Sequence, residues 1–533
     1  MRRREAVALA IGGAIPYMSP MITRNFIVLC TAVLAVAGEP ALAPPPVAAW
    51  DVVPHQEVTR PIHLGVVAFH LRPLSVAFRV DGGGKPLLDR TVSAPSRNPD
   101  TGVWEFVCPL DPASLPDGPV AVQARVTVQD SPATVLELQP LALIANAGGS
   151  LPAGRTVVVD AANGDDAGPG DAARPLRSLK AGLTAAGEAG TVRLRPGSYP
   201  AQGLGGGRRT RWTTIQPDEG VAAEAVVITP GRPGADKLRF VGLTFAADPE
   251  KKGYNTILAG EQGRHEVWID QCAMICRGGR EMGTVMFGNE YPAYITGGTV
   301  MDLNDGPSAR LMRGLVMRRI CSDAFTGARV AINCTVETID RGGSEAHPDF
   351  VQSHVGDKTA MKSFILYNCR GLRCGAQGFF GLNVQDSAFV NCLFVKDPPD
   401  SPLRSQYVGR MENVLFLHLT LPNQHWHWRG TGPLTRDVAF VNGVVPSMDG
   451  SDPQWMAGVS VRASHVVRPT AVLVEGASQG DPVFADPSAA DYRPRAGGPL
   501  AGSGVRLACV PADIDGEPWP DGAANRGCLR TAP

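Results

Sequence analysis

Two short strand patterns alternate through the middle of this chain of 533 residues, and their recurrence limits what it can fold into. Each copy is apolar and bounded by turn residues, and successive copies lie about 20–30 residues apart, with a few longer gaps. A unit of this size buries its apolar face only by stacking on its neighbours. The first pattern comprises 267–272, 315–321, 364–369, 388–392, 414–418 and 438–442. The second pattern comprises 284–287, 323–326, 349–352, 378–381, 406–409 and 426–429.

This recurrence predicts an all-β fold, a right-handed single-stranded parallel β-helix over about residues 155–475. A β-propeller needs longer units of paired antiparallel strands, so it fits the spacing less well. Two copies of the first pattern end in Asn-Cys, at Asn368 and Asn391, and a further strand-like context ends in Asn333-Cys334. Stacked asparagines can hydrogen-bond from coil to coil, and small apolar cysteines suit the inside of a solenoid.

The order of elements just before the repeats favours the same fold. A strand at 156–160 leads into a polar turn at 163–166, an amphipathic helix within 174–183, and a strand and turn at 190–199. This order resembles the opening of pectin-lyase-like β-helix proteins, where a helix covers the exposed end of the first coil. The resemblance implies the fold and says nothing of activity.

Residues from about 50 to 147 have a different sequence pattern. Short segments at 75–80, 103–107 and 120–128 alternate between apolar and polar residues, as strands do. Turn-forming sequences such as Pro116-Asp117-Gly118 separate them. Alternation with turns at this spacing predicts a small β-sandwich that precedes the β-helix. Part of this segment resembles bacterial immunoglobulin-like modules, which implies a spacer or a binding accessory. At the other end, residues 476–533 resemble the irregular closing segment of many β-helices.

Residues 1–43 have the features of a secretory signal peptide. Arg24 precedes an apolar run at 26–37, and Ala41-Leu42-Ala43 matches a cleavage site. The run is shorter than the about 20 residues that span a bilayer. We therefore expect a secreted protein, periplasmic or extracellular, with no membrane span. The cysteines form no zinc-ligand pattern, and Cys509 and Cys528 are the expected disulfide pair in an oxidising compartment.

The densest group of polar residues lies at 345–354, with the sequence Glu-Ala-His-Pro-Asp-Phe-Val-Gln-Ser-His. It resembles a His-Pro-Asp-x-x-Gln signature of some β-helix proteins thought to act on carbohydrate, although Phe350 stands where that pattern often has glycine. If the second strand pattern forms one sheet, equivalent side chains on successive coils lie ~4.8 Å apart. Asp323, Asp349, Gln377 and Gln406 would then stack.

The expected catalytic residues are His347, Asp349, His354, Asp323 and Arg410. The expected substrate-binding residues are Gln352, Gln377, Arg404, Gln406, His425, Trp426 and Trp428. Tryptophan rings suit the apolar C–H face of a sugar. Trp426 and Trp428 share one face of a strand by alternation, and that face fits the protein core equally well.

Three functions stay open for such a site. A lyase or C5 epimerase of an acidic polysaccharide uses a base such as histidine, and neutralises the uronate with Arg404, Arg410 or a divalent cation such as calcium. A glycoside hydrolase uses two carboxylates, and Asp323 and Asp349 on neighbouring coils could meet the ~5–5.5 Å spacing of retaining enzymes. The third function is a non-catalytic glycan-binding surface protein.

The sequence favours the lyase or epimerase, as a monomer that binds polysaccharide. The net charge of −1, with basic residues spread along the chain, argues against a nucleic-acid partner. Residues 302–306 are rich in Asp and Asn but lack the EF-hand spacing for calcium.

Overall fold

The computed structural model describes residues 43–532 apart from short internal stretches, and these residues belong to one unit, Leu42–Pro533. The internal stretches outside the description are 83–84, 206, 230, 248–254, 257–264, 277–282, 285–292, 326–328, 340–347, 354–360, 376, 398–405, 429–434, 451–457, 468–473 and 521–523. Only the backbone is described at a few strand positions, including 353, 380, 382, 406–408 and 428. The expected signal peptide falls almost wholly on residues 1–42, outside the described residues.

Two mainly antiparallel sheets form the first part of the described chain. One has the strand order β1 (Val47–Trp50), β3 (Ile62–Phe69), β7 (Trp104–Leu110) and β6 (Ser96–Arg97). The other has the order β2 (Glu57–Val58), β10 (Leu141–Ala145), β8 (Gly118–Val128), β4 (Leu74–Gly82) and β5 (Lys85–Val92), with β9 (Ser131–Glu137) beside β8. Residues along β8 alternate between buried and exposed, because one face of the strand packs on the core. We call residues 47–145 the sandwich.

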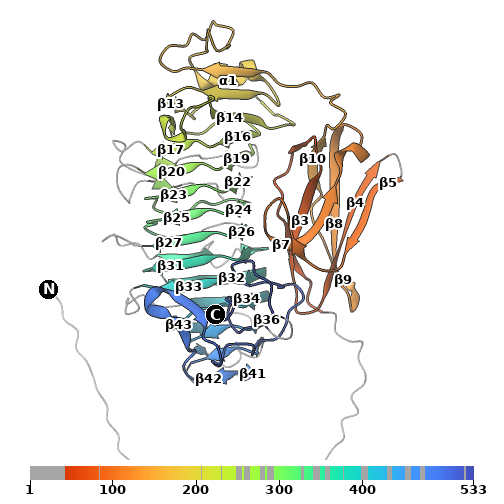
Figure 1. The fold of residues 1–533 in the computed structure, drawn as a ribbon, viewed down its shortest axis with the longest axis vertical. Helices are drawn as coiled ribbons and strands as arrows, with labels where there is room; N and C mark the ends of the chain where they lie inside the picture. The colour runs from red at the N-terminus through yellow and green to blue at the C-terminus, as the bar shows by residue number, and fades with distance from the viewer. Residues whose placement is uncertain are drawn as a thin grey trace, which may run out of the picture. The chain divides into compact units, whose positions relative to one another are not determined.

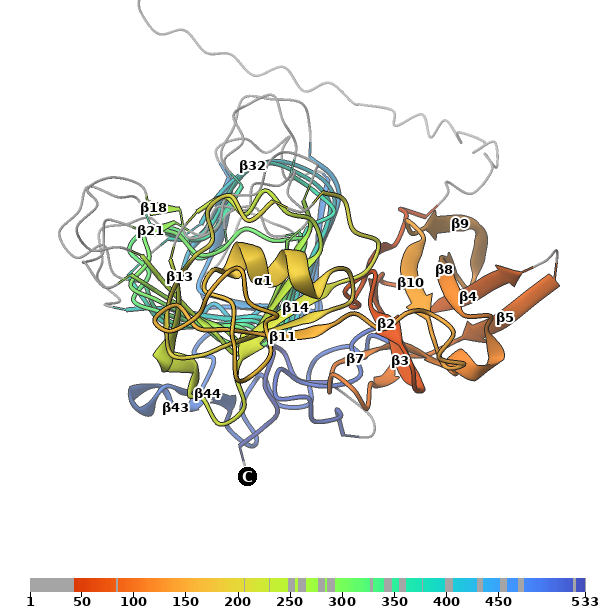
Figure 2. The ribbon, with the colours of Figure 1, turned by 90° about the horizontal axis from the view of Figure 1, so that it is seen from above.

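A short helix, α1 (Leu179–Ala186), lies over the open end of the first coils, above β11 (Thr156–Val159) (Figure 2). The hydroxyl of Ser178 caps the helix by accepting the N–H of Ala181 at 3.1 Å. Leu179 and Leu183 are buried, so the helix closes the apolar interior as the sequence predicts. A Cβ on Gly182 would lie 2.5 Å from a methyl carbon of Val159, which explains why glycine stands at this close approach.

Parallel strands stack through the rest of the chain and form a parallel β-helix (Figure 1). The longer ladder, sheet 1, consists of β11, β12 (Thr191–Leu194), β14 (Thr213–Pro217), β16 (Leu238–Val241), β19 (Val267–Asp270), β22 (Ala293–Thr296), β24 (Leu311–Arg313), β26 (Val330–Ile332), β28 (Asp349–Ser353), β29 (Met361–Lys362), β30 (Ile365–Tyr367), β32 (Gln377–Val390), β34 (Gln406–Leu417), β35 (Trp426–Trp428), β36 (Arg436–Val441), β38 (Met448–Gly450), β39 (Val459–Arg462) and β41 (Val474–Glu475). The fold class predicted from the sequence is confirmed.

The second ladder, sheet 2, is parallel throughout and is followed by a smaller one. Sheet 2 consists of β13 (Gly197–Pro200), β15 (Val226–Thr229), β17 (Thr244–Ala247), β20 (Ala273–Cys276), β23 (Thr299–Met301), β25 (Val316–Arg318), β27 (Thr335–Ile339), β31 (Arg370–Cys374) and β33 (Leu393–Lys396). The smaller ladder has β37 (Val444–Val445), β40 (His465–Val466) and β42 (Ser478–Gln479), and an isolated pair joins β18 (Asn255–Thr256) to β21 (Gly283–Thr284).

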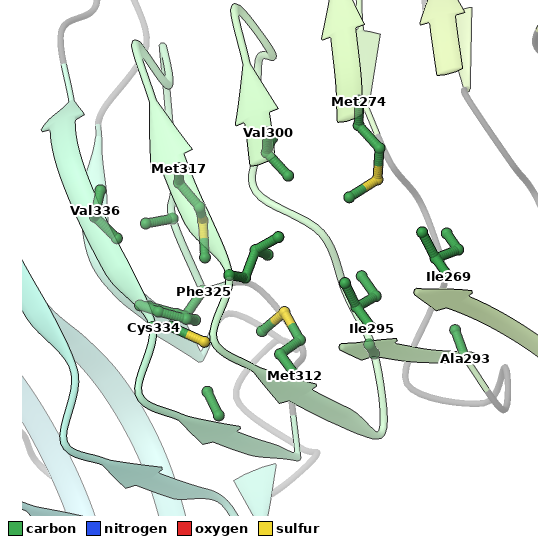
Figure 3. Packing of buried hydrophobic residues seen from close by; sticks show 14 of the residues in the cluster. Ile269, Met274, Ala293, Ile295, Val300, Met312, Met317, Phe325, Cys334 and Val336 are labelled. Carbon is green, nitrogen blue, oxygen red and sulfur yellow. The ribbon is translucent and has the colours of Figure 1, made fainter. Parts of the chain in front are cut away.

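The two sheets turn their apolar side chains toward each other. Ile295 and Met312 on sheet 1 belong to the same buried cluster as Val300 and Met317 on sheet 2 (Figure 3). The same contact recurs on each coil, so one continuous core runs along the solenoid.

A left-handed residue follows many strands of sheet 1 and turns the chain at one corner of the solenoid; these strands are β16, β19, β22, β24, β26, β30, β32, β34, β36, β39 and β41. The φ of this residue lies between 45° and 67° after each of these strands. The residues at this corner are Gly242, Gln271, Gly297, Gly314, Asn333, Asn368, Asn391, His418, Asn442, Ala463 and Gly476. Glycine and asparagine tolerate this conformation best, which explains the Asn-Cys repeat. The side-chain amide of Asn368 donates to Asn333 at 3.1 Å, as expected for stacked asparagines.

His418 occupies the same corner and is fully buried. Its ring stacks on Trp519 at 5.0 Å, and its Nδ1 lies 3.0 Å from the carbonyl oxygen of Gly527. Burial lowers the pKa of His418 to about 4, so this histidine is neutral and structural.

Cysteines after the corner stack inside the solenoid, as predicted. Cys334, Cys369 and Cys392 are buried on successive coils, and each thiol donates to the carbonyl oxygen two residues earlier, at 3.3–3.4 Å. The expected disulfide between Cys509 and Cys528 is wrong, because both thiols are free. The Cys509 thiol lies 3.2 Å from the carbonyl oxygen of His70, and the Cys528 thiol lies 3.3 Å from the Thr420 hydroxyl.

The closing segment covers the last coils and has little regular structure: β42, the hairpin of β43 (Phe484–Asp486) and β44 (Asp491–Pro494), and a 3-10 helix at Pro487–Ala489. Its backbone accepts hydrogen bonds from the corner, with Asn391 donating to the carbonyl oxygen of Ala512 at 2.8 Å. The sandwich also packs on the solenoid, since Phe69 meets Tyr367 at 5.1 Å and Arg313 binds the buried Asp51 carboxylate at 2.6 Å. None of the helices in the described residues has the length and apolarity needed to cross a membrane.

Candidate functional site

Acidic residues from three successive coils lie one after another in the middle of the solenoid. The Asp323 carboxylate accepts the backbone N–H of Asp349 at 2.8 Å, and the Asp305 carboxylate accepts the N–H of Asp323 at 3.4 Å. On the next coil, Asp349 pairs in register with Gln377. We call Asp305, Asp323, Asp349 and Gln377 the acid ladder. The predicted stacking of Asp323, Asp349 and Gln377 therefore agrees with the strand register.

Apolar side chains beside the ladder fix this register. Phe325 forms a parallel β-bridge with Val351, and Val351 pairs in register with Phe379 on the next strand. All three side chains are buried in the core. Asp323, Asp349 and Gln377 each stand two residues before one of these apolar residues. Because the core aligns the apolar positions from coil to coil, the polar residues two places earlier align as well.

Two of the three carboxyl groups of the ladder are held away from water. Asp323 is 6% exposed and Asp349 is 0% exposed. Burial raises the pKa of Asp323 to about 7, the charge of Asp305 adds to that rise, and the hydrogen bond from the Asp349 N–H opposes it. Burial also raises the pKa of Asp349 to about 8, assisted by the charge of Asp323 and opposed by a hydrogen bond with Gln377. The pair therefore retains a proton near neutral pH.

Such a pair can transfer protons at the pH where most enzymes work. A carboxyl group with a pKa near 7 or 8 donates a proton readily, and its ionised neighbour can act as a base or a nucleophile. Residues on adjacent coils lie ~4.8 Å apart, close to the ~5–5.5 Å that separates the two carboxyl groups of retaining glycosidases.

Gln406, which the sequence predicts in this stack, lies elsewhere, and so does Arg410, which the sequence predicts beside it. Gln406 pairs with Phe379 rather than with Gln377, so it is shifted along the sheet relative to the ladder. Arg410 pairs with Asn383, still farther along the strand, and its guanidinium lies 3.3 Å from Glu412. Arg410 therefore lies beyond the acid ladder along the sheet, and its predicted catalytic role stays a prediction. Strands β32 and β34 are long and continuous, which carries their charged residues past the ladder.

The expected role of Trp426 as a sugar platform is also corrected. Its side chain is 1% exposed, stacks parallel to Phe379 at 6.2 Å and meets Phe416 edge-on at 4.8 Å. Trp426 is thus a core residue. The neighbouring His425 is exposed, and its Nδ1 lies 2.5 Å from the Ser447 hydroxyl.

Of the remaining predicted site residues, some are described by the structure and others are not. Gln352 is half-buried on β28, next to the ladder. His347, His354 and Arg404 lie outside the described residues, as do the side chains of Gln406 and Trp428. Their predicted roles stay predictions.

Sequence reasoning missed Asp305 and Gln424. Asp305 lies in the segment weighed for calcium, whose Asp302 instead forms a bidentate pair with Arg319 at 2.6 and 2.7 Å. Gln424 is fully buried and stands two residues before Trp426, the offset that ladder residues have from their own core neighbours. That offset is the feature of the sequence that could have identified Gln424. Among the described residues, no group of three or more His, Cys, Asp or Glu side chains has the geometry of a metal site.

Comparison with known proteins yields distant structural likenesses. No protein-family model matches the chain, and no curated protein matches its sequence. A rhamnogalacturonan lyase aligns with 61% of this chain and 86% of its own, at 11% identity and a TM-score of 0.31. The GH136 lacto-N-biosidase from Eubacterium ramulus aligns with 61% of this chain and 68% of its own, at 12% identity and a TM-score of 0.26. Scores this low carry no conclusion about function.

Proposed function

We propose that this protein is a carbohydrate-active enzyme that cleaves glycosidic bonds of a polysaccharide, with Asp323 and Asp349 as its acid–base pair. The observation that carries the proposal is the hydrogen bond from the Asp349 N–H to the Asp323 carboxylate, which holds two buried carboxyl groups on neighbouring coils, where burial raises their pKa values to about 7 and about 8. Perturbed carboxyl pairs of this kind concentrate at catalytic sites.

In this mechanism Asp349 is the general acid, because its pKa is the higher of the two. It gives its proton to the glycosidic oxygen as the bond to the sugar carbon breaks, and ionised Asp323 attacks that carbon to form a glycosyl ester. A water molecule that Asp349 deprotonates then cleaves the ester and releases the sugar from Asp323. Asp305 and Gln377 act as positioning residues: the charge of Asp305 raises the pKa of Asp323, and Gln377 binds Asp349. The spacing of one coil predicts retention of anomeric configuration.

We propose hydrolysis rather than the elimination reaction that the sequence favours. Elimination needs a cation beside the uronate carboxylate, and Arg410 binds Glu412 instead of the ladder. A lyase or epimerase that uses His347 or His354, with or without calcium, remains the competing proposal, since these residues flank β28 in sequence.

A non-catalytic glycan-binding protein is the second candidate, and the complete burial of Asp349 favours it. Catalysis requires the chain around Asp349 to open so that substrate reaches the carboxyl group. In a binding protein the ladder would only order the coils, and its substitution would leave glycan binding intact.

The test is to incubate the purified protein with pectate, alginate, glycosaminoglycans and neutral glycans. The proposal predicts new reducing ends without the absorbance of unsaturated uronates, and turnover lower by about 10²–10⁴ in Asp323→Asn and Asp349→Asn. Asp302→Asn is the matched control, because its carboxylate binds Arg319 at the surface. Rising uronate absorbance supports a lyase, and binding without products supports the second candidate. Full turnover in both ladder variants contradicts the proposal.

A further inference from the structure

A cleft of about 700 Å³ lies between the sandwich and the first coils of the solenoid. The wall from the sandwich is apolar and comes from paired segments of β8 and β10, around Val120 and Leu143. The wall from the solenoid is charged and includes Arg208, Arg209, Lys237 and Arg310. A volume of this size falls within the range of about 300–1,000 Å³ that ligand sites occupy.

The charges that line the cleft leave a positive surplus. Its two carboxylates are already engaged: the Lys237 amine lies 3.2 Å from Asp236 and 3.5 Å from Glu266, and the His55 ring lies 3.2 Å from Glu266. The guanidinium groups of Arg208, Arg209 and Arg310 form no ion pair with another described residue. An anion in the cleft would therefore meet cations that no described acidic residue neutralises.

The charge of Arg209 is held in the cleft by burial and by a hydrogen bond to the backbone. The residue is only 8% exposed, and its guanidinium donates to the backbone carbonyl oxygen of Asp236 at 3.2 Å. The carboxylates whose charges act on Arg209 are those of Asp236 and Glu188. The Glu188 carboxylate already accepts the backbone N–H of Arg211 at 2.6 Å. Burying a cation without a paired carboxylate is costly, and a bound anion would offset that cost.

Size and shape identify the class of anion. A single phosphate or sulfate ion would fill a small part of 700 Å³, whereas several linked sugar units would occupy it and lay their C–H faces on the apolar wall. Carboxylates or sulfates on those sugars suit bidentate arginine contacts. Arg310 is also close in sequence to Asp305 of the ladder, and five residues of chain span at most ~18 Å.

We propose that this cleft binds an anionic stretch of a polysaccharide, a run of uronate or sulfated sugars. The choice of a saccharide rests on the proposed function, whereas the anion-binding property rests on the cleft alone. The inference gives the solenoid a substrate-holding site apart from the acid ladder, one to which the sandwich contributes a wall.

The test measures binding to the full chain by calorimetry with three probes: an oligogalacturonate, a heparin-derived oligosaccharide and a neutral cello-oligosaccharide. We expect the anionic probes to bind, more weakly at higher salt, and the neutral probe to bind at least 10-fold more weakly. Arg208→Gln combined with Arg310→Gln should weaken anionic binding by about 10–100-fold. Both side chains are exposed, so this variant keeps its fold. Arg174→Gln, an exposed arginine paired with Asp171, is the matched control.

The outcomes separate this proposal from the proposed function. Unchanged affinity in the double variant, equal affinity for neutral and anionic probes, or full competition by inorganic phosphate would each overturn the cleft assignment. The galacturonate and heparin probes distinguish carboxylate from sulfate recognition. Asp349→Asn should bind the anionic probe normally while losing turnover. If Asp349→Asn retains turnover, the proposed function fails and the cleft result still stands.

Discussion

Two stacks of polar residues run along the same solenoid. Burial leaves the side chains of one stack neutral and hydrogen-bonded, whereas in the other stack it raises the pKa values of carboxyl groups. At the corner between the sheets, Asn333 and Asn368 are neutral, adopt a backbone conformation that asparagine tolerates, and hydrogen-bond from coil to coil. In the acid ladder, Asp323 and Asp349 are titratable, and burial opposes their ionisation. The corner therefore serves stability, whereas the ladder holds protons near neutral pH at a cost in stability. This difference is why we place the chemistry at the ladder.

Substitution of Trp426 tests whether this residue belongs to the core beside the ladder or to a sugar-binding surface. Trp426→Ala should lower the free energy of unfolding by about 3–5 kcal/mol, because a fully buried aromatic side chain leaves a cavity. Denaturant unfolding measures the loss. A change below 1 kcal/mol, together with weaker glycan binding, would restore Trp426 as a sugar platform. Val505→Ala, a substitution at an exposed apolar side chain, is the control and should change little.

A smaller effect tests the corner. Asn368→Ala should cost about 2 kcal/mol, since it loses the hydrogen bond to Asn333 and places alanine at a φ of 55°. Asn368→Gly is the matched control, because glycine loses the same hydrogen bond without the strain, so it should cost about 1 kcal/mol less. Equal losses in the two variants would mean that the backbone conformation contributes nothing. Neither variant should alter turnover per folded molecule.

The corner was predictable from the sequence, and the ladder was predictable in part. Asn-Cys recurs at the corner because one conformation and one small buried side chain are required on each coil, so local chemistry repeats visibly. The ladder depends on register between coils of unequal length. Asp323, Asp349 and Gln377 were aligned correctly, but Gln406 was misplaced relative to Phe379.

The other differences have the same physical origin. Alternation showed that Trp426 and Trp428 share a face, but it could not show which face meets the core. The distance of Arg410 from the ladder along the sheet follows from the length of β34, which a short strand pattern does not show. The free thiols of Cys509 and Cys528 depend on the path of an irregular segment, for which the sequence has no periodicity.

The pH dependence of unfolding tests the central claim, that the ladder keeps Asp349 protonated. A carboxyl group whose pKa is raised in the folded state stabilises the protein below its unfolded value of 3.8, and that stability is lost as the pH rises through about 8. Asp349→Asn removes this titration. The variant should therefore gain stability relative to the wild type, from less than about 1 kcal/mol at pH 4 to about 5 kcal/mol at pH 8. A difference that stays constant between pH 4 and pH 8 would contradict the account.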